Sequence, residues 1–537
     1  MATGGDALVA ALRALGVEVA FGLPGVHNLA AWKAFGRVSS SGAGVRLVGV
    51  RHEQTAGYAA DGYARATGRL GVAVTTTGPG ASNVVTATGE AWACHSPLLV
   101  IATDIPTTLR RAGAYRGVLH ETVDQAGFFR PVTKAQVHVT SVDALYDDVV
   151  RAGQLAMEHP RRPVYLEIPT DLLSAPTAEP APAPTDPSTP PRADAPAGPH
   201  DRAVEALLAA QRPLVWAGGG ATSAGAGALV ERLARALGAP VLTSYGGRGL
   251  LPPDSPHLVP LPPHVEPAGA LWDAADCVVV LGSDLDAMNT QGFRQPRPPT
   301  LVDVDLRRPA NIDPDVWLQE DVASALPHLL AALPPRDREP WFVRPSGREG
   351  YAGPATAFLD ALEAGLPEDA VVVADMCVAG YWYGGFGRVA QPRGLAYPVG
   401  WGTLGFGFPA SLGAALSGRP TVALVGDGGF LFGCGDLATA AQERLPVTVV
   451  LVDDGGYGML RYDFVKDGEE PVGTELEPPD FVALAAAFRV PAREVTVDGL
   501  TAAVAEGIAS GAPNLVVLKA RFDPPPNTSP NWYRVRA

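Results

Sequence analysis

Gly426-Asp427-Gly428-Gly429 is followed, after one predicted helix, by Asp453-Asp454-Gly455-Gly456-Tyr457-Gly458. Glycines let backbone N–H groups approach phosphate oxygens, and carboxylates hold a divalent cation against those oxygens. A single Gly-Asp-Gly string is more typical of a surface turn. Two acidic, glycine-rich segments in one arrangement predict instead a site for a metal ion and a diphosphate group.

The segments around these motifs predict a scaffold for that site. Residues 421–425 (TVALV) and 446–452 (PVTVVLV) are apolar runs typical of strands buried on both faces, and residues 436–444 (DLATAAQER) predict a helix between them. A right-handed crossover then places Asp427 and Asp454 just beyond the carboxyl ends of parallel strands, where open α/β sheets bind ligands.

Strand and helix patterns alternate along the whole chain, which predicts an α/β fold of three doubly wound parallel-sheet domains. The predicted strands are residues 19–21, 46–50, 70–75, 98–103 and 164–168 in the first domain, 213–217, 240–242, 277–281 and 300–304 in the second, and 370–374, 422–425, 447–452 and 514–519 in the third.

Shifts in composition set the predicted boundaries. Residues 175–198 are rich in proline and nearly lack large apolar side chains, so we expect an extended linker there. The predicted units are a first domain (1–174), this linker (175–198), a central domain (199–333), a second linker (334–350), a third domain (351–522) and a tail (523–537). The tail, which carries three consecutive prolines, either packs as a strap across the surface or stays mobile.

The composition narrows the class of protein. The chain of 537 residues is 47% hydrophobic and 18% charged, with no apolar segment of membrane-spanning length and no signal-peptide pattern at its start, so we expect a cytoplasmic protein. Its net charge of −15, without a basic stripe, argues against nucleic acid and anionic membranes as partners. The four cysteines are scattered and show no metal-ligand or redox spacing.

Further motifs stand in order around the glycines and aspartates. They are residues 21–25 (FGLPG), 51–65 (RHEQTAGYAADGYAR), 78–83 (GPGASN) and 399–409 (VGWGTLGFGFP). Together they resemble the thiamine-diphosphate-dependent superfamily of 2-oxo acid decarboxylases and acetolactate synthases, over nearly the whole chain. The resemblance implies a pyrimidine-binding, a central and a diphosphate-binding domain. It also shows one departure, because the family motif usually has two asparagines where this chain has Asp453-Asp454.

The resemblance implies roles for residues near the reactive end of the cofactor. Glu53 matches the glutamate that shares a proton with the aminopyrimidine ring, and among apolar neighbours its pKa is expected to be raised. Leu404 matches the bulky residue that bends the cofactor, and Gly402 the backbone carbonyl that accepts from the amino group. His27 lies in the loop where family members carry residues facing the thiazolium, and His120 aligns with the stretch where decarboxylases have a histidine and acetolactate synthases have Gln-Glu. A histidine near the reactive carbon can relay protons. Either histidine alone is more often structural.

At the diphosphate end, Asp427 and Asp454 are implied as side-chain ligands of Mg²⁺, with Gly456 contributing its carbonyl. The other residues implied in cofactor binding are Pro79, Asn83, Val378, Gly426, Gly428, Gly429 and Tyr457. A carboxylate at position 454 adds a negative charge beside the diphosphate. We therefore expect a stricter need for the metal, and a sharper loss of cofactor below neutral pH, than with asparagine.

The resemblance leaves several activities open. The leading hypothesis is an enzyme that decarboxylates a 2-oxo acid, or cleaves a C–C bond next to a carbonyl, and then releases or transfers the acyl unit, as acetolactate synthases do. One alternative is a simple decarboxylase or lyase of the benzoylformate decarboxylase or benzaldehyde lyase type. Another class is a regulatory protein that keeps the fold without catalysis; Asp453-Asp454 favours it, whereas Glu53, Gly402 and Leu404 argue against it.

Two further expectations concern FAD and assembly. Flavin-binding relatives carry an arginine soon after the central strand at 277–281, whereas here none follows until Arg294, which argues against FAD. In the family the glutamate and the diphosphate motif that form one site come from different subunits. A homodimer or homotetramer with the active site at the subunit interface, acting on a small molecule, is therefore expected.

Overall fold

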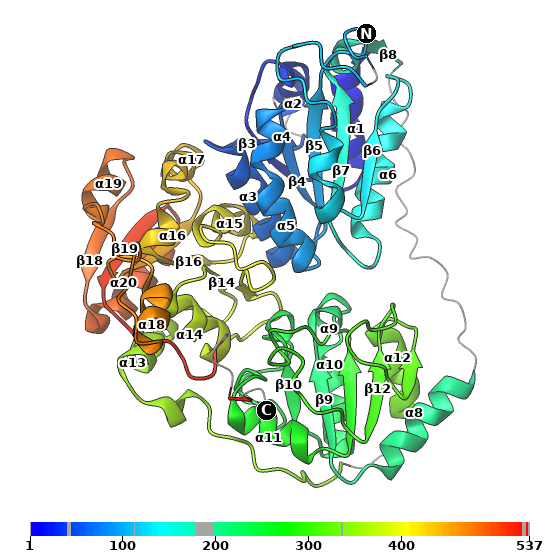
Figure 1. Cartoon of the computed structure of the whole chain (residues 1–537), viewed down its shortest axis with the longest axis vertical. Helices are drawn as coiled ribbons and strands as arrows, with labels where there is room; N and C mark the ends of the chain where they lie inside the picture. Colours follow the sequence, from blue (N-terminus) through cyan, green and yellow to red (C-terminus); the bar gives the residue numbers. More distant parts are fainter. Residues whose placement is uncertain are drawn as a thin grey trace.

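The computed structural model describes residues 2–39, 44–111, 113–178, 197–334, 337–528 and 533–534. Three parallel sheets, each flanked by helices, follow one another along the chain (Figure 1). This confirms the predicted fold class. Most of the predicted proline-rich linker, residues 179–196, lies outside the described residues, as do 335–336 of the second linker and most of the final part of the tail.

The N-terminal sheet has the order β3-β2-β4-β5-β7-β6, with every neighbouring pair parallel. Its strands are β2 (Val19–Gly22), β3 (Arg46–Gly49), β4 (Gly71–Thr75), β5 (Leu98–Asp104), β6 (Ala135–His138) and β7 (Val164–Pro169). Its helices are α1 (Gly4–Ala14), α2 (Leu29–Ser39), α3 (Glu53–Thr67), α4 (Pro79–Asn83), α5 (Val85–Ala93), α6 (Leu145–Met157) and α7 (Thr170–Ser174). A short antiparallel pair joins β1 (Ala2–Thr3) to β8 (Pro176–Thr177).

The central sheet has the order β10-β9-β11-β12-β13. Its strands are β9 (Pro213–Ala217), β10 (Val241–Thr243), β11 (Cys277–Leu281), β12 (Thr300–Val304) and β13 (Val316–Leu318). Its helices are α8 (Ala197–Ala209), α9 (Gly219–Ser223), α10 (Gly227–Leu237), α11 (Glu266–Ala274) and α12 (Val322–Ala332).

The C-terminal sheet has the order β15-β14-β16-β17-β19-β18 and is also parallel throughout. Its strands are β14 (Val371–Ala374), β15 (Leu395–Ala396), β16 (Thr421–Gly426), β17 (Val447–Asp453), β18 (Ala492–Val495) and β19 (Asn514–Lys519). Its helices are α13 (Pro354–Ala364), α14 (Val378–Phe386), α15 (Gly407–Ala414), α16 (Asp427–Phe430), α17 (Leu437–Glu443), α18 (Gly458–Lys466), α19 (Phe481–Ala487) and α20 (Val497–Ala509).

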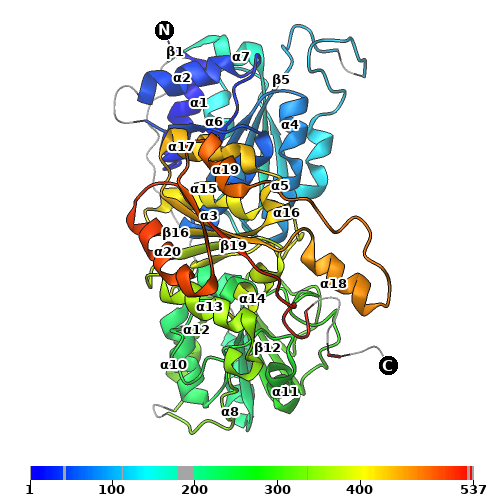
Figure 2. The ribbon, with the colours of Figure 1, turned by 90° about the vertical axis from the view of Figure 1, so that its left-hand side faces the viewer.

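Helices α3 and α15 join the N-terminal and C-terminal domains (Figure 2). Their backbones touch at two glycines, because a Cβ added at Gly62 would overlap the carbonyl of Ala410, and one added at Gly413 would overlap the carbonyl of Ala59. Helix α3 itself is well bounded: the His52 side chain caps its first turn, and Gly68 ends it in the left-handed conformation.

A buried ion pair network reinforces this contact. Arg65 of α3 lies 2.6 Å from Asp61 and 3.2 Å from Glu90 of α5, and both carboxylates are fully buried. Burial opposes the charge of Arg65, but the two acids hold its pKa well above the ordinary value. Arg65 also donates to the Tyr397 carbonyl, and Glu90 accepts from the backbone N–H of Trp401. The network thus attaches residues 397–401 to the N-terminal domain.

The described end of the tail lies on the central domain. Arg534 pairs with Asp273 of α11 at 2.5 Å, and its carbonyl accepts from Arg294. The two alternatives for the tail were a strap packed on the surface and a mobile segment. Residues 533–534 are packed on the surface of the central domain. Among the helices of the described residues, none is long and apolar enough to cross a membrane.

The contact between α3 and α15 predicts a large cost for a methyl group at Gly413. We expect Gly413→Ala to lower the free energy of unfolding by about 2 kcal/mol or more, because the backbones must separate to admit it. Gly36→Ala is the matched control, since no atom lies within 4 Å of its added Cβ. Thermal denaturation of both variants is the measurement. Equal midpoints would show that the two helices do not need this close approach.

Candidate functional site

The two acidic motifs meet at the carboxyl edge of the C-terminal sheet. Strands β16 and β17 are parallel neighbours, and Asp427 and Asp454 directly follow them, as predicted. Both carboxylate oxygens of Asp427 are buried and accept no hydrogen bond from any described residue. Burial, and then the nearby Asp454, raises the pKa of Asp427 to about 6. Buried acceptor oxygens without donors are what a hard cation satisfies, so these residues fit a Mg²⁺ site.

The glycines around these carboxylates shape a narrow space. A Cβ at Gly428 would lie 2.7 Å from the ring of Tyr457, and one at Gly429 would lie 3.0 Å from a carboxylate oxygen of Asp375. Gly456 has a φ of 144°, and a Cβ there would overlap the Thr474 carbonyl. Side chains at these positions would collide with neighbouring protein atoms, so only glycine is accommodated, and the backbone N–H groups of such glycines fit the binding of a diphosphate.

Asp375 is a site residue that the sequence analysis missed. It follows β14, is buried, and accepts from the backbone N–H groups of Met376 at 2.8 Å and Gly407 at 3.2 Å. Burial raises its pKa to about 6. Asp375 therefore fixes the start of α15 against the diphosphate cradle. The sequence did contain a pattern that could have predicted this residue. Asp375 follows the apolar run 371–374, as Asp427 follows the apolar run of β16.

Asp454 has a counter-charge that the sequence analysis did not foresee. Arg461 of α18 lies 3.3 Å from its carboxylate and also donates to its backbone carbonyl. Arg521 donates to the same carbonyl at 2.8 Å, and both arginines lie 3.2 Å from Glu475. Burial nevertheless raises the pKa of Asp454. The additional negative charge at position 454 is thus partly balanced within the protein.

The N-terminal domain gathers a second group of predicted residues. Glu53 begins α3, is buried, and accepts from the side-chain amide of Asn83 at 2.9 Å. A Cβ at Gly80 would lie 3.2 Å from the other carboxylate oxygen of Glu53. Pro79 begins the short helix α4 that carries Asn83. Glu53, Pro79 and Asn83 therefore lie together, as the resemblance implied.

His27 and His120 belong to the same group. Their rings pack edge to face with centroids 5.2 Å apart. His27 Nδ1 lies 2.9 Å from the Thr77 hydroxyl, which in turn lies 2.9 Å from that of Thr103. Burial, and then the neighbouring His120, lowers the pKa of His27, so its ring is neutral at pH 7.

Gln125 positions this group and was also missed. Its side-chain oxygen accepts from the backbone N–H of Gly78 at 2.6 Å, and its amide donates to Tyr165 at 2.8 Å and Glu167 at 3.1 Å. A Cβ at Gly78 would lie 2.6 Å from the carbonyl of His120. Gln125 thereby holds the loop that carries His120 against the loop that precedes α4. A lone glutamine gives no signal in the sequence.

The remaining predicted residues lie in the C-terminal domain. Val378 begins α14, and Gly402 has a φ of 69° in the turn before α15. Leu404 is only half-buried in this chain, although its type suggests a core residue. The structure therefore divides the predicted residues between two domains. The C-terminal group consists of Val378, Gly402, Leu404, Gly426, Asp427, Gly428, Gly429, Asp454, Gly456 and Tyr457.

Glu53 does not face the C-terminal group of its own chain. Residues Ala59 and Gly62 touch α15, and the Tyr58 ring packs edge to face on Phe406 at 5.5 Å. At 100° per residue, Glu53 lies about 120–180° around α3 from these positions. Glu53 and the contacts with the C-terminal domain therefore lie on different faces of α3, and we refer to the two groups as the N-terminal and C-terminal half-sites.

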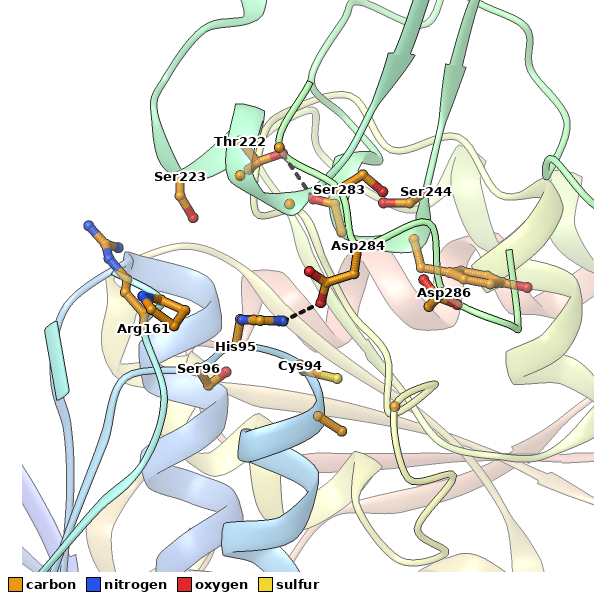
Figure 3. A pocket seen from close by; sticks show the side chains of 18 of the residues that line it. Cys94, His95, Ser96, Arg161, Thr222, Ser223, Ser244, Ser283, Asp284 and Asp286 are labelled. Atoms are coloured by element: carbon orange, nitrogen blue, oxygen red, sulfur yellow. Dashed lines mark hydrogen bonds and ion pairs between the residues drawn. The ribbon is translucent and has the colours of Figure 1, made fainter. Parts of the chain in front are cut away.

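A separate cavity of about 470 Å³ lies between the three domains (Figure 3). Across it, His95 of the N-terminal domain pairs with Asp284 of the central domain at 2.6 Å, which is the main reason that the pKa of Asp284 is lowered. The segment after β11, Gly282 to Asp284, lines the cavity and carries no arginine. None of the predicted cofactor residues lines it.

Comparison with known families identifies the architecture. Family models described as the N-terminal, central and C-terminal domains of thiamine pyrophosphate enzymes match residues 2–128, 200–333 and 376–518. The chain belongs to the thiamine pyrophosphate enzyme family. This confirms the prediction of a thiamine-diphosphate-dependent enzyme of the lyase or transferase type, in preference to the non-catalytic alternative.

Individual relatives of this thiamine pyrophosphate enzyme agree. The chain is 38% identical over 512 residues to a probable 2-ketoarginine decarboxylase of Pseudomonas aeruginosa, covering 92% of this chain and 89% of that one. It is 31% identical over 529 residues to an acetolactate synthase of Mycobacterium bovis, covering 90% and 82%. A solved Rhodococcus jostii 4-hydroxybenzoylformate decarboxylase has a TM-score of 0.83 at 26% identity, covering 97% and 100%.

Proposed function

We propose that the protein decarboxylates a 2-oxo acid with thiamine diphosphate and Mg²⁺ and releases an aldehyde. When bound, the cofactor supplies a nucleophilic carbon and an acceptor for the electrons that carbon dioxide leaves behind. Two relatives whose names include decarboxylase, one by sequence and one by structure, support this choice. The observation that carries it is the contact between the rings of His27, which is buried, and His120, which is partly buried.

The histidine pair supports aldehyde release because that outcome needs a proton at the acyl carbon. Thr77 engages Nδ1 of His27, which leaves Nε2 to exchange protons. The lowered pKa of His27 keeps this ring neutral at pH 7. A proton that the ring takes up from His120 or from solvent is therefore held weakly and is readily passed on to the acyl carbon.

In this proposal the two groups have distinct tasks. Glu53 holds a proton at the aminopyrimidine, with Asn83 fixing its second oxygen. The Gly402 carbonyl would accept from the amino group of the cofactor, and Leu404 would support the cofactor. Asp427, Asp454 and the Gly456 carbonyl would hold Mg²⁺. The remaining contacts with the cofactor come from Pro79, Val378, Gly426, Gly428, Gly429 and Tyr457.

Carboligation is the second candidate, favoured by the acetolactate synthase relatives. It uses the same residues up to the loss of carbon dioxide and then joins the acyl unit to a second carbonyl compound. Product analysis separates the two, because decarboxylation gives an aldehyde and carboligation gives an acyloin or acetohydroxy acid.

The first test is a screen of 2-oxo acids with guanidino, aromatic and short aliphatic side chains. We expect carbon dioxide and one aldehyde, identified by NMR, and a loss of about 10²–10⁴-fold in kcat for Glu53→Gln because proton exchange at the aminopyrimidine fails. Glu18→Gln, at an exposed glutamate, is the matched control. An acyloin as the main product would favour carboligation. No carbon dioxide from any acid would contradict both.

We propose that each active site is formed by two copies of the chain. The support is the orientation of Glu53, which faces away from residues 402–406 of its own chain. Apolar side chains near the N-terminal half-site are also exposed: Val26 is 64% exposed and Leu119 58%. A second copy would cover them.

We also expect the purified protein to contain no FAD and therefore to show no flavin absorption band.

Subunit mixing tests this arrangement. Glu53→Gln and Asp427→Asn are expected to be inactive separately, whereas a mixed dimer has one site with both changes and one intact site. Random exchange makes about half of the dimers mixed, so the mixture should recover about 25% of wild-type activity. Each variant exchanged with itself is the control. No recovery in a mixture shown to contain mixed dimers would mean that each site belongs to one chain.

Arg461 and Asp454 give a third test, by a double-mutant cycle. Arg461→Met leaves the Asp454 carboxylate with less counter-charge, so we expect binding of Mg²⁺ and thiamine diphosphate to weaken about tenfold or more. Adding Asp454→Asn should recover part of that loss. Calorimetric titration is the measurement, and Arg493→Met, which removes an exposed pair with Glu506, is the control. Additive effects would show that the two residues act independently.

A further inference from the structure

Three potential metal ligands converge on the outer part of the central domain. His200 belongs to α8, His328 belongs to α12, and Glu320 lies between β13 and α12. One ligand atom from each residue lies within 4.8 Å of the other two. In the part of the chain that the structure describes, no other group of three or more histidine, cysteine or acidic side chains meets this criterion.

The contacts within this cluster bring two imidazoles to one carboxylate. His200 Nε2 lies 3.0 Å from Glu320 Oε1, yet this nitrogen forms no hydrogen bond with any described group. The rings of His200 and His328 lie 5.4 Å apart at 82°, so both imidazoles stand beside one carboxylate. A ring nitrogen and a carboxylate oxygen at this distance form an ion pair when the ring is protonated, and they are also close enough to serve as two ligands of one cation.

The burial of the three residues suits an ion that enters from solvent. Glu320 is buried, His200 is partly buried and His328 is exposed. The backbone N–H of Glu320 donates to the Leu318 carbonyl, which fixes the acid next to the end of β13. The carboxylate therefore provides a fixed anionic ligand, and the exposed imidazole can turn toward an incoming ion.

We propose that His200, Glu320 and His328 bind one divalent transition-metal ion of the zinc type. Ligand bonds of 2.0–2.2 Å in a tetrahedron put the ligand atoms about 3.4 Å apart, which lies within the range of separations found here. Small side-chain rotations close the site, and the fourth position takes water. Two imidazoles select zinc, copper or nickel over magnesium. The proposed ligands at Asp427, Asp454 and the Gly456 carbonyl are all oxygen atoms, and such ligands favour magnesium over zinc, copper or nickel.

The proposed ion would join elements that are separate in the sequence. Helix α8 begins the central domain after the proline-rich segment and packs against α12 and β13 (Figure 1). A metal bridging His200 and His328 would hold these two helices together. Because the ion binds the folded domain only, it would raise the thermal stability of that domain without taking part in the reaction.

The test uses full-length protein freed of metal with a chelator and then held in excess Mg²⁺ and thiamine diphosphate. Titration with Co²⁺ should give visible absorption from one four- or five-coordinate ion per chain, and Zn²⁺ should displace it. His200→Ala and His328→Ala should each weaken Zn²⁺ binding by about 100-fold or more, beyond the 10–100-fold that loss of an outer partner costs. Both should also lose the rise in melting temperature that Zn²⁺ causes.

His138→Ala is the matched control, because His138 also pairs with a glutamate, Glu167 at 3.1 Å, but has no third ligand in the described structure. It should bind Zn²⁺ as the wild type does. His328 is exposed, so its variant folds even if the His200 variant does not, and circular dichroism verifies both. Absence of the Co²⁺ spectrum in the wild type, or Zn²⁺ binding that survives His328→Ala, would overturn the proposal.

Discussion

The backbone contact between α3 and α15 fixes the rest of the arrangement. At Gly62 and Gly413 each helix touches the main chain of the other, so neither can rotate or slide without a collision. One face of α3 is therefore committed to the C-terminal domain of the same chain, and Glu53 is left on another face. The buried Arg65 network then attaches residues 397–401 to this unit. The proposed sharing of each site between two chains follows from this constraint.

Three carboxylates at the edge of the C-terminal sheet have different surroundings. Asp375 is buried and accepts backbone hydrogen bonds, and Asp454 is partly buried with an arginine beside it. Asp427 is as buried as Asp375, but its carboxylate oxygens accept no hydrogen bond from a described residue. Leaving a buried charge unpaired costs several kcal/mol unless an ion compensates it. In the proposed site a cation is therefore most needed at Asp427, and Arg461 limits the cost of a second acid beside it.

The sequence predicted the interior strands and missed most of the edges. Strands β6, β13, β15 and β18 were not predicted, and each lies at an edge of its sheet. An edge strand has one neighbour and is often half exposed, so it lacks the continuous apolar run that marks a central strand. The site residues, too, were predicted only where the sequence has a recognisable pattern. Glycines and acids after buried strands have a pattern, whereas the contacts of Gln125 and Arg461 join residues far apart in the sequence or depend on geometry that only the folded chain creates.

The two half-sites impose different chemical conditions. The N-terminal group consists of neutral or proton-exchanging side chains in a buried setting, where desolvation keeps His27 uncharged. The C-terminal group is strongly acidic, and an arginine lies beside it. In the proposed function the C-terminal group would hold the cation and the N-terminal group would move protons, so a change in the histidine pair would alter the fate of the acyl unit without disturbing metal binding. On this proposal the choice between aldehyde release and carboligation depends on the N-terminal half-site.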